Sequence, residues 1–118
     1  MKIKLGADPE FFVVDTQHMR LTSAHDLVPG TKDKPHALTN GACQVDGCAV
    51  EYNIKPASTA AEFIQFNNEV LEQLRKIIPD RYEFIFKPTV EFDEFYFDKG
   101  IPEKPKELGC SATFNAWK

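Results

Sequence analysis

The segment from residue 60 to 78 constrains the fold most, because it predicts one long helix with a single apolar side. Thr59 and Glu62 match a capping box, which satisfies free backbone N–H groups at the helix start, and Pro79 ends the helix because it lacks an N–H. The side chains that share one helical face are Phe63, Phe66, Asn67, Val70, Leu71, Leu74, Ile77 and Ile78. Asn67 is the polar member, and we expect it to hydrogen-bond to neighbouring backbone within the core. Such a helix needs another surface on which to bury this side.

Short segments of β character on both sides of the helix supply that surface. The predicted strands are Lys2–Leu5, Glu10–Asp15, Met19–Thr22, Gln44–Asp46 and Ala49–Ile54 as a hairpin around Gly47, Tyr82–Lys87 and Thr89–Phe92. Residues 23–41, which contain two prolines and two glycines, predict a long polar loop that is either a lid over a substrate or a surface excursion. The chain is therefore expected to form one α+β domain over residues 1–118, an antiparallel or mixed sheet with the long amphipathic helix packed on one face.

Composition excludes several classes of function. A chain of 118 residues with 42% hydrophobic residues can bury a core, and a net charge of −4 gives no basic face for nucleic acid. No stretch approaches the roughly 20 apolar residues that span a bilayer, and no signal peptide is recognisable, so we expect a cytoplasmic protein that binds neither membrane nor nucleic acid. Ten phenylalanines and an uncovered sheet face also make a homo-oligomer an expectation.

Two glutamates stand out inside the predicted strands. Strand alternation puts Glu51 and Asn53 on one face and Val50 and Tyr52 on the other, so Glu51 points away from the helix if the apolar set meets it. Glu10 begins an otherwise apolar strand, where an unpaired carboxylate is costly to bury. Two such glutamates on neighbouring strands would repel each other unless a metal lay between them, and magnesium prefers oxygen ligands of this kind. Acidic residues on exposed sheet faces are also common without any metal.

Four segments resemble a known family. GADPEF (residues 6–11), QVDG-AVEYN (44–53), AAEFIQFNNEV (60–70) and LGCSATFNAW (108–117) look like the type-2 COOH–NH2 ligases of tailed bacteriophages. That family is placed in the glutamine synthetase and glutamate–cysteine ligase superfamily. The resemblance covers most of this chain but only about the first half of such a ligase.

The resemblance implies a glutamine synthetase-like catalytic fold that uses Mg²⁺ and ATP to phosphorylate a carboxylate and join it to an amine as an amide. It makes Glu10 and Glu51 the candidate metal ligands, and gives Asp8, Asp46 and Asn53 supporting or substrate-contacting roles. Ligases of this family carry further His and Arg motifs downstream, which this chain lacks. We therefore expect it to be the N-terminal portion of a larger ligase, inactive alone.

Two other functions stay open at this point. The chain could be a non-catalytic, truncated or degenerate relative that serves as a phage structural or interaction module. It could also be a metal-dependent hydrolase that uses the same carboxylates.

Overall fold

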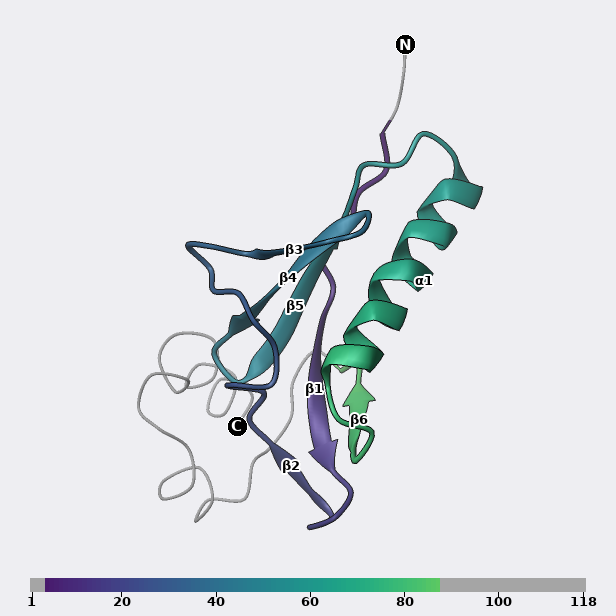
Figure 1. The fold of residues 1–118 in the computed structure, drawn as a ribbon. Coiled ribbons are helices and arrows are strands. Elements are labelled where there is room, and N and C mark those ends of the chain that lie inside the picture. Colours follow the sequence, from purple (N-terminus) through teal and green to yellow (C-terminus); the bar gives the residue numbers. More distant parts are fainter. Residues whose placement is uncertain (1–3, 88–118) are drawn as a thin grey trace.

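The computed structural model describes residues 4–87, which form a six-stranded sheet and one helix (Figure 1). The elements in chain order are β1 (Glu10–Asp15), β2 (Arg20–Thr22), β3 (His36–Leu38), β4 (Gly41–Asp46), β5 (Ala49–Ile54), α1 (Ala60–Ile77) and β6 (Tyr82–Ile85). The α+β fold with one long helix on a sheet is confirmed. Every pairing between these strands is antiparallel, so the described sheet is not mixed.

Strand β1 changes partners along its length. Its first residues pair with β5, with Glu10 opposite Glu51, and its later residues pair with β2 and β6, with Val13 opposite both Thr22 and Phe84. The strand order is β2-β1-β5-β4-β3, with β6 also on β1. The change of partners falls at Phe12, two residues after Glu10, so Glu10 lies in the part of β1 that pairs with β5.

Helix α1 begins where the capping pattern predicts. Thr59 Oγ1 accepts a hydrogen bond from Glu62 N at 3.1 Å, and Glu62 Oε1 accepts one from Ser58 N at 2.8 Å. The helix ends at Ile77, one residue before the predicted end, and Ile78 is its C-cap. Figure 1 shows α1 lying along one side of the sheet, where it contacts β5 and β4.

The core lies between α1 and the facing side of the sheet. Its fully buried side chains include Phe11, Val13, Val50, Val70 and Leu74. The sequence predicted that Asn67 would hydrogen-bond to backbone, but the partner that the structure shows is a side chain. Asn67 Oδ1 accepts a hydrogen bond from the Tyr52 hydroxyl at 2.8 Å, because a strand tyrosine on the same face reaches across to it.

The long polar loop predicted for residues 23–41 is only partly a loop. It contains β3, which pairs with β4, and Ala24 and Val28 are buried in the core. Its end is fixed to α1, because Thr39 N donates to Gln73 Oε1 at 2.8 Å and Gln73 Nε2 donates to Thr39 O at 2.9 Å. Sequence reasoning missed these elements because β3 is short and its neighbours are polar.

Other strand boundaries also differ from expectation. Strand β4 begins at Gly41 rather than at residue 44, and β6 ends at Ile85 rather than at residue 87. Leu5 forms an isolated bridge with Ala57, and of the strand predicted over residues 2–5 the structure describes residues 4 and 5. The strand predicted over residues 89–92 and the segment 108–117 lie outside the described residues.

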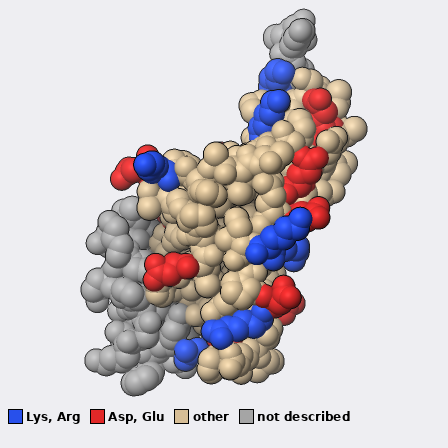
Figure 2. All heavy atoms as spheres, viewed as in Figure 1, with Lys and Arg blue, Asp and Glu red and all other residues tan. Residues whose placement is uncertain are grey.

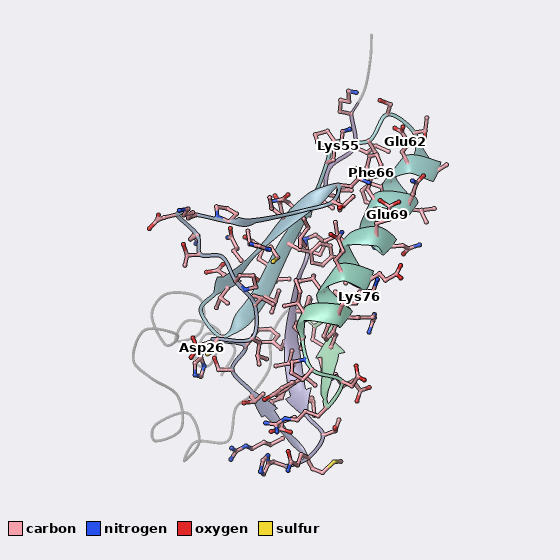
Figure 3. The ribbon with its side chains drawn as sticks, viewed as in Figure 1. Asp26, Lys55, Glu62, Phe66, Glu69 and Lys76 are labelled. Carbon is pink, nitrogen blue, oxygen red and sulfur yellow. The ribbon has the colours of Figure 1, made fainter. Side chains whose placement is uncertain are left out.

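Charged side chains gather on the outer side of α1. Figure 2 shows acidic and basic atoms following α1 along the right of the view, with few over the middle. At the end of β5, Lys55 lies beside the helix with its Nζ 5.9 Å from the centre of the Phe66 ring (Figure 3). The helix therefore presents an apolar side to the sheet and a charged side to solvent, as its periodicity predicts.

Candidate functional site

Glu10 and Glu51 face each other across two adjacent strands, on the side of the sheet away from α1. They are directly opposite in the β1–β5 pairing, where side chains of facing residues lie about 5 Å apart. On β5, Val50 and Tyr52 are buried in the core below the helix, so alternation turns Glu51 to the other face. The sequence predicted this orientation for Glu51.

Asp46 completes a cluster with the two glutamates. Each of the three side chains offers a carboxylate oxygen, and these oxygens all lie within 4.8 Å of one another. Asp46 is the last residue of β4, two residues beyond Gln44, which pairs with Glu51. The Gln44 side-chain amide donates to Glu51 Oε2 at 2.7 Å and so holds one of its oxygens. We call Glu10, Asp46 and Glu51 the acidic cluster.

Asp8 and Asn53 lie one step further along the same face. Tyr52 N donates to Pro9 O at 3.0 Å and Ile54 N donates to Ala7 O at 3.3 Å, which continues the β1–β5 register beyond the strand. In that register Asp8 stands opposite Asn53, and both are exposed. They flank the acidic cluster on its solvent side without being part of it.

The opposite flank of the acidic cluster is apolar. Phe12, two residues after Glu10, and Ala49, two residues before Glu51, are each only 3% exposed. Partial burial is the main cause that raises the pKa of Glu10, followed by repulsion from Asp46. Burial likewise raises the pKa of Glu51 first, with repulsion from Asp46, Glu10 and Asp8 adding to it. Carboxylates that are drier and more crowded than usual gain most from a cation.

Lys32 is a neighbour that sequence reasoning missed. Its Nζ lies 3.6 Å from Asp46 Oδ1, and its positive charge opposes the rise in the pKa of both glutamates. No periodicity marks residue 32, because it reaches the cluster from the connection between β2 and β3. The Pro29-Gly30 pair just before it was the available signal, since it indicates a tight turn.

A second polar group, also missed, lies at the other end of β1. Asp15 is 4% exposed, and its carboxylate is 2.8 Å from His18 Nδ1 and 3.5 Å from a guanidinium nitrogen of Arg81. Gln17 N donates to Asp15 Oδ1 at 3.0 Å. The hydrogen bond with His18 is the main cause that lowers the pKa of Asp15, and Arg81 adds to it. These contacts join the β1–β2 turn to the start of β6.

The acidic cluster has the donor set that Mg²⁺ uses. Around an octahedral Mg²⁺, neighbouring oxygens are about 3.0 Å apart and opposite oxygens about 4.2 Å apart. Three oxygens within 4.8 Å of one another therefore need to move by only about 1 Å, a side-chain adjustment, to share one ion. The donors fit the cation. Asp46 offers its own carboxylate oxygen to the cluster, whereas the resemblance gave it a supporting or substrate-contacting role.

No protein-family model, curated protein or solved structure matches this chain significantly. Within residues 4–87, no helix combines the length and the apolar character that crossing a membrane requires.

Proposed function

We propose that this chain carries part of the active site of an ATP- and Mg²⁺-dependent carboxylate–amine ligase that forms an amide through an acyl phosphate. The observation that carries the proposal is the acidic cluster, three carboxylates that converge on the face of an antiparallel sheet opposite its helix. The resemblance of residues 6–11 and 44–53 to the phage ligases supports the same reaction. We expect ATP and small or peptide acids and amines as substrates, in the cytoplasm of the phage host.

Each residue of the site has a role in this proposal. Glu10, Asp46 and Glu51 hold the cation, which when bound neutralises charge on the transferred phosphoryl group. Gln44 holds Glu51 in place, because its side-chain amide donates a hydrogen bond to Glu51 Oε2. Asp8 and Asn53, exposed one step further along the face, are free to contact the acid or the amine.

The test is a calorimetric titration of the folded chain with Mg²⁺. Glu10→Gln and Glu51→Gln keep shape and remove charge, and each is expected to weaken Mg²⁺ binding at least about 10-fold. Glu83→Gln is the control, because Glu83 is a strand glutamate that is exposed like Glu10 but lies on β6, outside the cluster. Equal Mg²⁺ affinity in all four proteins would remove the metal site and the ligase mechanism with it.

One observation favours a second candidate, the non-catalytic structural or interaction module. Gln44 already donates to Glu51 and Lys32 already pairs with Asp46, so protein groups alone partner two of the three carboxylates. In that case the chain is expected to keep the same unfolding midpoint with and without millimolar Mg²⁺. A midpoint that rises with Mg²⁺ in the parent and not in Glu51→Gln favours the ligase.

A further inference from the structure

Lys32 stands at the tip of a turn that two backbone hydrogen bonds close. Thr31 N donates to Lys34 O at 3.0 Å and Lys34 N donates to Thr31 O at 3.1 Å, so Lys32 and Asp33 form the tip between them. Thr31 Oγ1 accepts a further hydrogen bond from Lys34 N. The backbone of this turn is therefore self-contained, and its position depends on the residue before it.

Gly30 presses the base of the turn against β3 and β4. Val45 N donates to Gly30 O at 3.2 Å, and the φ of Gly30 is +97°. A Cβ at this position would lie 2.4 Å from Cys43 O and 2.7 Å from His36 N, both backbone atoms that cannot move aside. Only glycine allows this approach, which brings the turn within reach of Asp46 at the end of β4.

The Lys32 ammonium remains accessible although it is paired. The Lys32 side chain is 62% exposed, whereas that of Asp46 is 19% exposed, so the ammonium lies on the solvent side of the cluster. Three carboxylates and one ammonium leave a formal charge of −2 when all are ionised. That charge equals the charge of one divalent cation in magnitude and has the opposite sign.

We propose that Lys32 neutralises Asp46 before the cation binds, and that the cation displaces it so that it then holds an anionic phosphate oxygen of the co-substrate. This inference rests on the proposed function, which supplies the cation and the phosphate. An ammonium and a divalent cation repel each other, so both cannot remain on one Asp46 carboxylate without loss. A lysine on a flexible stem binds phosphate as a point charge, which suits a side chain that changes partner.

The experiment compares Lys32→Met with Lys34→Met by calorimetric titration, first with Mg²⁺ alone and then with the Mg²⁺ complex of a non-hydrolysable ATP analogue. Lys32→Met is expected to bind Mg²⁺ about 3- to 10-fold tighter, because the competing charge is gone, and to bind the nucleotide complex about 10-fold more weakly. Lys34→Met has the same net charge but removes a lysine with no ion pair within residues 4–87. It is expected to change both affinities less than about 2-fold.

The outcomes separate this inference from the function on which it rests. Mg²⁺ binding that disappears in Glu51→Gln but is equal in the two lysine variants overturns the inference alone. Weaker Mg²⁺ binding by Lys32→Met also overturns it, because the lysine would then be shaping the site rather than competing for it. Binding that Glu51→Gln leaves intact overturns the proposed function and this inference together. A thermal unfolding curve for each variant establishes that the titrated protein is folded.

Discussion

The two ends of strand β1 each carry an acidic residue, and the fold treats them in opposite ways. At one end, Glu10 faces Glu51 and Asp46, and burial and repulsion raise its pKa. At the other end, Asp15 is held by His18, Arg81 and a backbone N–H, which lower its pKa. The Asp15 end is therefore internally neutralised, as expected of a structural contact. The Glu10 end keeps an unbalanced charge, which is what a cation site requires.

The largest effect is expected from the apolar middle of the strand, which keeps the two ends in place. Phe11 is 0% exposed, and Phe11→Ala should lower the free energy of unfolding by about 3–5 kcal/mol through lost burial and a residual cavity. Ile64→Ala, at a helix position that is 60% exposed, is the control and should change it by less than about 0.5 kcal/mol. Denaturant titration measures both. Similar losses in the two variants would mean that β1 is not anchored by its core face.

The next largest effect is expected at the neutralised end. Asp15→Asn leaves His18, Arg81 and Gln17 N without the carboxylate that they share, so the melting temperature should fall. Asp80→Asn, an exposed acidic residue near the same end, is the control for loss of one negative charge. An unchanged melting temperature in Asp15→Asn would mean that the contacts of Asp15 do not stabilise the fold, and that the two ends of β1 do not differ in this way.

A smaller effect of opposite sign is expected at the crowded end. Without divalent cations, Glu10→Gln removes a like charge directly opposite Glu51 and should raise the free energy of unfolding by about 0.2–1 kcal/mol. Glu83→Gln on β6 again serves as the control. A loss of stability in Glu10→Gln would show that Glu10 is a structural residue like Asp15.

The smallest effect is expected in the pH dependence of stability. Above the ordinary value of 4.5 and up to their raised pKa values, the folded glutamates hold more protons than the unfolded ones, so stability should fall as pH rises through that window. Asp15 acts in the reverse sense, and its contribution is present above its ordinary pKa of 3.8 and is lost as pH falls through the lowered value. Denaturant midpoints across this range, without metal, should decline above 4.5 in the parent. The decline should disappear in the double variant Glu10→Gln/Glu51→Gln, and its persistence there would assign it to other groups.

Much of the fold could be predicted because its signals are local. The boundaries of α1 follow from Thr59, Glu62 and Pro79, and the face on which Glu51 lies follows from alternation along β5. The partnership of Glu10 with Glu51 was an expectation from the resemblance and from neighbouring strands, and the register brings the two together. These features depend on period and capping, which a sequence displays directly.

The remaining features depend on approaches between distant segments. Lys32 reaches Asp46 through a turn that only a close backbone contact at Gly30 positions, and no repeat in the sequence marks it. Arg81 reaches Asp15 from 66 residues away in the chain, across the β1–β6 pairing. Both partners are cations on connections, where spacing carries no information about the neighbour in space.

The alternation of an outward carboxylate at Glu10 and a buried ring at Phe11 also favours the correct alignment of β1 with β5. If β1 slipped by one residue against β5, alternation would turn the Glu10 carboxylate toward the apolar interior and expose the Phe11 ring on the outer face. Neither side chain tolerates that exchange, so the misaligned pairing is penalised twice. Glu10, a proposed ligand of the ion, therefore also helps to set the register between β1 and β5 when the sheet forms.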